Sequence, residues 1–229
     1  KRNKYIILLT NSYALAEEEQ KKLKSMGIRS NLYDELLTNA QFIHDSLKSR
    51  DEKPFEGLGN KCFLYAGNKP AYLSDLDIEI VEDMKEADFI LIQDFDLSRQ
   101  KIADVDKDLR KGVQNRLPAF CLNPGSKALM AGNFLMGANM LALKYQDFGG
   151  VVHYIGKPHS PIFNYCIRDL QSIDIYPGQT VMIGDTMAHD IVGATAVNID
   201  TCLVKTGLHY GSFKNLSSPG EVDRALNTL

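Results

Sequence analysis

Short polar segments follow apolar runs in this chain, and their residue types suit the binding of a phosphate group. Thr10, Asn11 and Ser12 follow the first apolar run, and Lys157 follows a later one. A threonine hydroxyl and backbone N–H groups at the start of a helix suit phosphate oxygens. A lysine at the same sheet edge supplies a compact positive charge that can neutralise a phosphoryl group. These four residues are candidates for substrate binding, and Thr10 and Lys157 are also candidate catalytic residues.

Two aspartates follow the apolar run 180–183 and suit a magnesium ion. Asp185 comes directly after Gly184, which allows a tight turn. Magnesium prefers hard oxygen donors, keeps several waters and takes only one or two protein carboxylates. Asp190, further along the chain, could hold the water shell of the metal or orient Lys157. The sequence therefore predicts magnesium as the cofactor, with Asp185 and Asp190 as its site and Asp185 as a third catalytic residue.

Each of these signals has a plain structural alternative. A threonine and an asparagine after a strand commonly cap a helix, and Gly-Lys-Pro and Gly-Asp segments commonly form turns. We expect His159, in the segment GKPH, to cap or pack. The joint occurrence of these segments, in this order at strand ends, is what favours a functional site.

The elements that must position these residues alternate at both ends of the chain. Strands are expected at residues 5–9, 151–155, 180–183 and 201–204, and helices at 14–26, at 34–47 with Asp34 at the start, from Ser160, at 189–197 and from Pro219. Such alternation predicts a parallel sheet that is covered on both faces. Ligands bind such sheets at the carboxyl ends of the strands, which is where the polar segments fall.

The middle of the chain has a different pattern. Short strands are expected at residues 62–66, 78–81, 89–93 and 119–122, with a helix that carries Ile102, Val105 and Leu109 and a glycine-spotted helix at 132–146. We therefore predict an α/β fold in which the two terminal pieces form one sheet and the middle segment is an inserted module.

Composition excludes several classes of protein. Apolar residues make up 44% of the chain and charged residues 24%, which is ordinary for a globular protein. The net charge of −3 lacks the basic field that nucleic-acid binding needs. The apolar runs fall far short of the roughly 20 residues that a membrane span needs. We expect neither nucleic acid nor membrane as a partner.

The cysteines show no metal-binding or redox spacing. Cys62, Cys121, Cys166 and Cys202 lie far apart in the sequence, without a CxxC pair. Each falls in an apolar strand or helix pattern, so we expect buried, reduced thiols in a cytoplasmic protein.

Three segments, taken together, resemble a known family. They are LLTNS at residues 8–12, IGKPH at 155–159 and MIGDTMAHDI at 182–191, with a long module between the first two. This order resembles the haloacid dehalogenase (HAD) superfamily of phosphatases, in particular its class IIA or NagD-like branch. The resemblance covers nearly the whole chain.

The resemblance implies a fold and a division into domains. Residues 1–38 and 151–229 would form a Rossmann-like core, and residues 39–150 would form a large α/β cap inserted between the second and third motifs. Such a cap would close over the site and choose the substrate. Its strand edges could pair across a two-fold axis, which makes a homodimer through the cap one prediction.

The resemblance also implies roles for the candidate residues. The Thr10 hydroxyl would bind the transferring phosphoryl group, with Asn11 beside it, and Lys157 would be the third-motif lysine. Asp185 would coordinate magnesium, and Asp190 would support it.

The first motif of the family, a DxD element that carries the nucleophile, has no match before Thr10. Residues 94–96 have the spacing but fall inside the cap segment, and residues 75–77 precede their strand, so we expect turns at both places. In the family the strand with this motif lies mid-sheet, and its loss would leave unpaired backbone groups at about 1–3 kcal/mol each. We therefore expect the nucleophile in a segment upstream of Lys1.

The sequence thus predicts a magnesium-dependent phosphatase that hydrolyses a small phosphorylated metabolite through an aspartyl-phosphate intermediate. The alternative is a catalytically silent HAD-like protein that binds a phosphate ligand, or an inactive fragment. A DxD element upstream would favour the enzyme.

Overall fold

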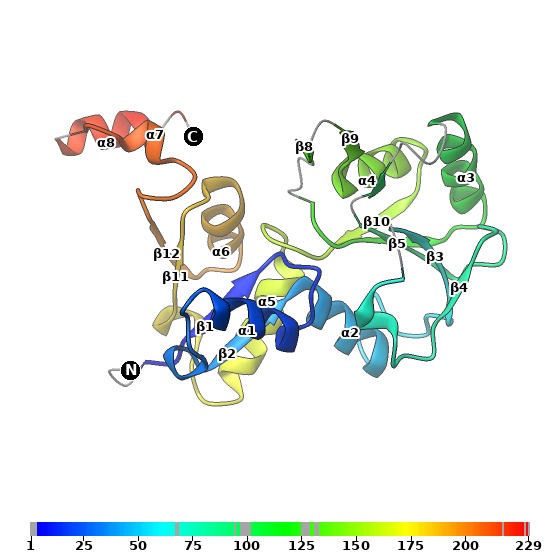
Figure 1. Ribbon diagram of the computed structural model, residues 1–229, viewed down its shortest axis with the longest axis horizontal. Helices are drawn as coiled ribbons and strands as arrows, with labels where there is room; N and C mark the ends of the chain where they lie inside the picture. Colours follow the sequence, from blue (N-terminus) through cyan, green and yellow to red (C-terminus); the bar gives the residue numbers. More distant parts are fainter. Residues whose placement is uncertain are drawn as a thin grey trace. The chain divides into compact units, whose positions relative to one another are not determined.

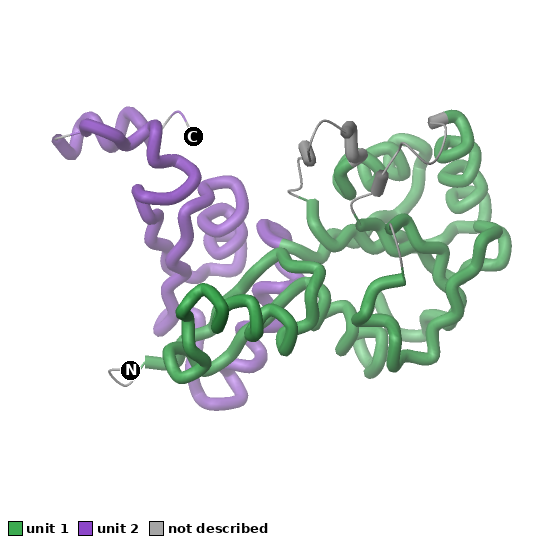
Figure 2. Tube along the Cα trace, viewed as in Figure 1, with its two compact units in different colours: residues 1–156 green, residues 157–229 purple. Residues whose placement is uncertain are grey.

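The computed structural model describes residues 4–66, 69–93, 95–96, 102–124, 129–130, 133–216, 218–226 and 228 (Figure 1). For residues 95–96, 102, 129–130 and 133–136 it describes the backbone alone. The chain forms two compact units, residues 1–156 and residues 157–229 (Figure 2).

Unit 1 begins with two parallel strands, each followed by a helix. The elements are β1 (Ile7–Thr10), α1 (Ala16–Ser25), the 3-10 turn η1 (Ser30–Leu32), β2 (Glu35–Thr38) and α2 (Asn39–Ser49). The register places Thr10 opposite Thr38, so both strands end at the same level. The loop after β1 and the start of α2 after β2 therefore lie side by side.

The prediction that a helix begins at Asp34 is wrong about where that helix begins. Strand β2 comes first, and α2 follows with Thr38 as its cap, whose hydroxyl accepts a hydrogen bond from the Gln41 N–H at 2.9 Å. The Asp34 carboxylate instead accepts from the Ile6 N–H at 3.0 Å, beside the start of the β1–β2 ladder. A short apolar run fits both the helical and the strand period, and pairing with β1 decides between them.

The main sheet of unit 1 has five parallel strands in the order β10-β7-β5-β3-β4. The strands are β3 (Lys61–Tyr65), β4 (Glu79–Val81), β5 (Phe89–Ile92), β7 (Pro118–Cys121) and β10 (Val151–Tyr154). The four strands expected in the middle segment are confirmed to within one residue. The turn expected at residues 75–77 lies, as expected, just before β4.

Strand β10 lies in a different place from the one that the sequence suggested. It was expected to start the C-terminal piece of the core, whereas its residues pair with β7, from Val151 opposite Pro118 to Tyr154 opposite Cys121. Periodicity identifies a strand but not its neighbours, because pairing partners are remote in sequence. The division into residues 1–38 with 151–229 and an inserted 39–150 stays a prediction.

One face of this sheet packs against two helices, α3 (Ile102–Gln114) and α4 (Ala138–Asp147) (Figure 1). Val105 and Leu109 of α3 and Leu141 and Tyr145 of α4 are fully buried in the cluster that they form with the strands. Burial of each such leucine contributes about 1.5–3 kcal/mol. The Tyr145 hydroxyl donates to the Leu117 carbonyl at 2.7 Å, and burial raises the pKa of this tyrosine to about 12.

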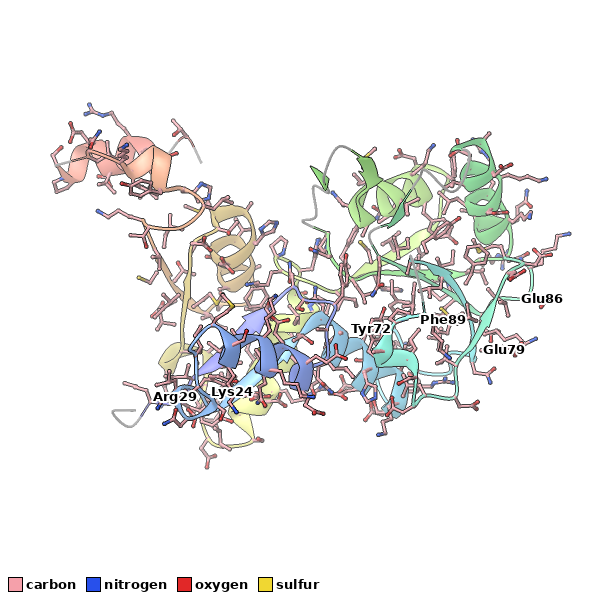
Figure 3. The ribbon with its side chains drawn as sticks, in the orientation of Figure 1. Lys24, Arg29, Tyr72, Glu79, Glu86 and Phe89 are labelled. Carbon is pink, nitrogen blue, oxygen red and sulfur yellow. The ribbon has the colours of Figure 1, made fainter. Side chains whose placement is uncertain are left out.

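Aromatic rings line the opposite face, because successive strand residues point to opposite sides. Phe120 stacks on Phe55 with ring centroids 4.8 Å apart, and Phe42 of α2 meets Phe55 edge-on at 6.2 Å. Phe89, labelled in Figure 3, belongs to the same layer, since its ring meets Phe120 edge-on with the centroids 6.0 Å apart. The sheet is therefore covered on both faces, as a parallel sheet requires.

The helix expected at residues 132–146 is shorter than predicted. Residues Asn133–Met136 form strand β9, which pairs antiparallel with β6 (Phe95–Asp96) and β8 (Leu129–Met130), and only then does α4 begin. The turn expected at residues 94–96 is likewise replaced by β6 at residues 95–96. Asp94, Ser98, Gly125 and Gly132 lie outside the described residues.

Unit 2 contains one pair of parallel strands and several helical segments. The elements are α5 (Ser160–Gln171), the 3-10 turn η4 (Pro177–Gln179), β11 (Val181–Gly184), the π-helical turn η5 (Met187–Ile191), α6 (Val192–Ala196), β12 (Asp200–Leu203), α7 (Tyr210–Phe213) and α8 (Pro219–Leu226). The expected strands are confirmed to within one residue, as are the helices from Ser160 and Pro219, whereas the helix expected at residues 189–197 is a π-helical turn followed by the short α6. The single sheet that was expected from the two terminal pieces of the chain is not confirmed, because β1–β2 and β11–β12 form separate pairs. Val181 and Ile183 of β11 are exposed.

Two further expectations concern the surface and the cysteines. No described helix is long and apolar enough to cross a membrane. The four cysteines are free, and three are buried as expected, but Cys202 is exposed. Cys202 lies on β12, whose first three residues are exposed, so an apolar strand pattern did not imply burial there.

A histidine clamp fastens α2 to the turn before β4. The His44 side chain is buried, its Nδ1 lies 2.8 Å from Asp45 Oδ1, and its Nε2 lies 3.2 Å from both oxygens of Asp75. The hydrogen bond from His44 lowers the pKa of the Asp75 carboxyl. Because the pKa is lowered, this contact stabilises the fold fully at pH values above the ordinary pKa of an aspartate. The stabilisation is lost as the pH falls through the lowered pKa.

We expect His44→Phe to raise the pKa of Asp75 toward its ordinary value, because the hydrogen bond is its main cause. An NMR titration of the carboxyl carbon measures this. His153→Phe is the control, because His153 stacks on Phe120 and has no contact with Asp75 among the described residues. An Asp75 pKa that stays low in His44→Phe would contradict the clamp.

Candidate functional site

The first part of the candidate site lies where β1 and β2 end. Thr10 and Thr38 are register partners, so Asn11 and Asn39 follow adjacent parallel strands. The Asn39 side chain is fully buried, and its Nδ2 donates a hydrogen bond to the Leu122 carbonyl at the end of β7. Asn39 therefore joins the carboxyl end of the β1–β2 pair to the carboxyl end of β7 in the five-stranded sheet.

Gly156 packs against this part of the site and leaves almost no room for a Cβ atom. A Cβ atom at position 156 would lie 2.8 Å from Asn11 Oδ1 and 2.9 Å from the Leu122 carbonyl oxygen, and closer still to Asn39 Nδ2. The two asparagine side chains thus converge on the residue that directly precedes Lys157 in the sequence. The glycine in the GKP segment is needed for space rather than for a turn conformation.

Ser12 has a structural partner in unit 1. Its hydroxyl donates to the buried Glu19 carboxylate at 2.7 Å and accepts from the Ala14 N–H at 3.2 Å. Its carbonyl accepts from the Ala40 N–H at 3.2 Å. These bonds fix the loop after β1 against the start of α2, so the geometry favours a positioning role for Ser12. Substrate binding by Ser12 stays a prediction.

Unit 2 brings together the three charged candidates. Lys157 Nζ lies 2.6 Å from Asp190 Oδ1, and the two side chains are only 13% and 6% exposed. Asp190 Oδ2 accepts from the Thr186 N–H at 3.0 Å. Both oxygens of Asp190 are thereby engaged, which favours the orientation of Lys157 as its role.

Asp185 has more room for a ligand. Its Oδ2 accepts from the Leu208 N–H at 2.8 Å, while its Oδ1 has only the Thr186 hydroxyl at 3.4 Å among the contacts described. Gly207 lets the loop after β12 come this close, since a Cβ there would overlap the Asp185 side chain. Gly184 has the same relation to Asp190.

The donor set fits magnesium, with most of the coordination left to water and substrate. Within the described ranges no three His, Cys, Asp or Glu side chains form a group that could hold a metal ion. Magnesium does not need such a group, because it keeps several waters and binds substrate phosphates. Asp185 has the half-engaged carboxylate suited to it, whereas metal binding by Asp190 stays a prediction.

His159 begins α5 at the cap position without a side-chain capping hydrogen bond. Burial lowers its pKa, which keeps the imidazole neutral near pH 7. The expected capping by its side chain is not seen, and packing fits the burial.

Three residues that position the site were not predicted from the sequence. Glu19 looks like a solvent-facing helix residue, Asn39 like an ordinary polar residue, and His209 has no metal-ligand spacing. Their roles arise from contacts with Ser12, Leu122 and Met187, which are remote in sequence. Only the polar residue at the end of an apolar run, at Asn39, was a usable signal.

The fold is similar to that of one family of hydrolases. Residues 154–220 match the model of the HAD-hydrolase-like family. A hydrolase of the haloacid dehalogenase-like family from Brucella suis is 25% identical, with a TM-score of 0.70 over 93% of this chain and 80% of that chain. NagD from E. coli is 20% identical, with a TM-score of 0.64 over 93% of this chain and 79% of that chain. The chain resembles HAD-like hydrolases with NagD among its structural neighbours, as its motifs predicted.

Two curated relatives are phosphatases by name. The chain is 24% identical over 205 residues to an acid sugar phosphatase of Staphylococcus saprophyticus, which covers 89% of this chain and 74% of that protein. It is 38% identical over 78 residues to a phospholysine phosphohistidine inorganic pyrophosphate phosphatase of Xenopus laevis, which covers 34% of this chain and 27% of that protein.

We expect Asp190→Asn to lower the free energy of unfolding by about 3 kcal/mol, because it removes the charge that compensates a buried ammonium. Urea unfolding of the whole chain measures this. The control is Glu17→Gln, which breaks the exposed Glu17–Lys21 pair and should cost less than about 1 kcal/mol. Equal losses in the two variants would show that burial of the Lys157–Asp190 pair has no energetic consequence.

We expect Gly156→Ala to destabilise unit 1 by about 1–3 kcal/mol, as for other overpacked sites, because a Cβ has no free volume among the two asparagines. Gly178→Ala is the matched control, since nothing lies within 4 Å of a Cβ there. Thermal unfolding separates the variants, and an unchanged melting temperature for Gly156→Ala would contradict the packing.

Proposed function

We propose that this protein is a magnesium-dependent phosphomonoester hydrolase that acts on a small phosphorylated metabolite. The observation that carries this proposal is the arrangement in unit 2, where a buried lysine is held by Asp190 while Asp185 keeps an oxygen for a metal. Two relatives with phosphatase in their names support the same chemistry.

In the proposed reaction each residue acts on the phosphoryl group or on its neighbours. Lys157 neutralises phosphoryl oxygens, and Asp190 holds its ammonium in place. The Thr10 hydroxyl and the backbone of Asn11 and Ser12 donate to other phosphoryl oxygens. Magnesium, held by Asp185, supplies charge neutralisation for the phosphate. Catalysis of this kind is mostly positioning and electrostatics, so the placement of these groups is the enzyme's main contribution.

The proposed reaction also needs a nucleophilic aspartate, which forms an aspartyl-phosphate that water then hydrolyses. We propose that this aspartate belongs to a DxD element upstream of Lys1, and that its strand pairs in the core sheet. The exposed apolar residues of β11, Val181 and Ile183, support a further element against that pair of strands. We propose that residues 39–150 act as the cap that chooses the substrate.

We expect Asp185→Asn and Lys157→Ala each to lower kcat by several orders of magnitude while the protein stays folded. The assay is magnesium-dependent release of phosphate from p-nitrophenyl phosphate by the full-length protein. Asp200→Asn is the control, because Asp200 is exposed on β12. Retained activity in both site variants would contradict the assignment. Binding of phosphate without turnover by the unaltered protein would favour the silent binding protein.

The position of the nucleophile has its own test. A strand, a loop and a helix need about 30 residues. The intact mass of the natural protein should therefore exceed 25.6 kDa by at least that segment. A natural mass of 25.6 kDa would leave the chain without the proposed nucleophile.

A further inference from the structure

His209 lies in the loop that follows β12 and contacts Met187, which lies between Asp185 and Asp190 in the sequence. Its Nε2 accepts a hydrogen bond from the Met187 N–H at 3.1 Å. Met187 begins η5, the turn that contains Asp190. The neighbouring residue, Leu208, donates its N–H to Asp185 Oδ2 at 2.8 Å. Two successive residues of the loop after β12, Leu208 and His209, therefore form hydrogen bonds with Asp185 and Met187 of the segment after β11.

We propose that His209 is a positioning residue for the metal-binding carboxylate of Asp185. The inference rests on the proposed function, since it assigns a role in the same site. The side chain does not itself touch Asp185 among the contacts described. It acts through the backbone. The His209 contact to Met187 fixes the distance between the loop after β12 and the turn after β11, and thereby places the Leu208 N–H that donates to Asp185.

The chemistry of the contact restricts what can replace the histidine. An N–H donor needs an acceptor, so Nε2 carries the lone pair and Nδ1 carries the proton. The first N–H groups of a helical turn have no partner within the turn, and a side chain that accepts from one of them fixes the start of that turn. Without the acceptor, the Leu208 N–H bond to Asp185 is the one hydrogen bond that remains, among the described contacts, between the segment 207–209 and the segment 185–191.

The loop after β12 is tightly packed near Asp185, beside the contact of His209 with Met187. Gly207 lies so close to Asp185 that a Cβ would overlap its side chain, whereas a Cβ at Gly211, two residues after His209, would meet nothing within 4 Å. The loop therefore packs tightly against Asp185 at Gly207 and has open space at Gly211. Removal of a group that orients a metal-binding carboxylate typically lowers metal affinity about 10-fold to 100-fold.

The test compares two replacements of the same histidine in the whole chain. His209→Phe keeps the ring and removes the acceptor, and His209→Gln keeps an acceptor at a similar reach. We expect His209→Phe to weaken magnesium binding about 10-fold or more in isothermal titration calorimetry, and His209→Gln to keep most of the affinity. His189→Phe is the matched control, because His189 lies on the same turn and makes no side-chain hydrogen bond among the described contacts.

A second measurement tests the hydrogen bond between His209 and Met187 in the absence of magnesium. The Met187 amide should exchange with deuterium faster in His209→Phe than in His209→Gln, at unchanged circular dichroism. Equal exchange, or equal magnesium affinity in the two variants, would overturn the role of His209.

The proposed function can fail in a different way, and the result shows which idea is wrong. If the unaltered chain binds magnesium and Asp185→Asn abolishes binding, the metal site stands, and an unaffected His209→Phe then overturns the role of His209 alone. If the unaltered full-length protein binds no magnesium, both proposals are overturned.

Discussion

The buried pair of Lys157 and Asp190 is the interaction on which the site in unit 2 depends. An ammonium that is 13% exposed needs a carboxylate close by, because desolvation of an uncompensated charge costs several kcal/mol. Asp190 meets this need with one oxygen and binds the Thr186 backbone with the other. The charge on the lysine thereby fixes the turn between Asp185 and Asp190, and the position of Asp185 follows from it.

Close backbone approach is the second constraint, and glycines make it possible at three places. Gly156 admits the two asparagines of unit 1, while Gly184 and Gly207 admit the two aspartates of unit 2. In each case a Cβ would occupy the volume of a polar side chain. A site made of strand ends can only be compact if the loops beside those strands lack side chains at such points. The glycines are therefore part of the site, although none carries a functional group.

The functional groups are distributed so that rigid elements hold them and loops adjust them. Strand register places Thr10 beside Thr38, and the buried Asn39 joins the end of β2 to the end of β7. In unit 2, β11 leads into the turn with both aspartates, and the loop after β12 braces that turn. The chain shares its overall fold with the hydrolase from Brucella suis. The proposed phosphoryl transfer depends on such an arrangement, because in that chemistry the placement of charge matters more than covalent chemistry by the site.

The sequence by itself determined the α/β class, the positions of most strands and the location of Thr10, Lys157 and Asp185 at strand ends. These features follow from local periodicity and from residue type after an apolar run. Tertiary structure decided the rest. It made a strand of residues 35–38, moved β10 into the five-stranded sheet and gave partners to Glu19 and His209. The physical reason is that hydrogen-bond partners remote in sequence leave no local pattern, so only the folded chain selects them.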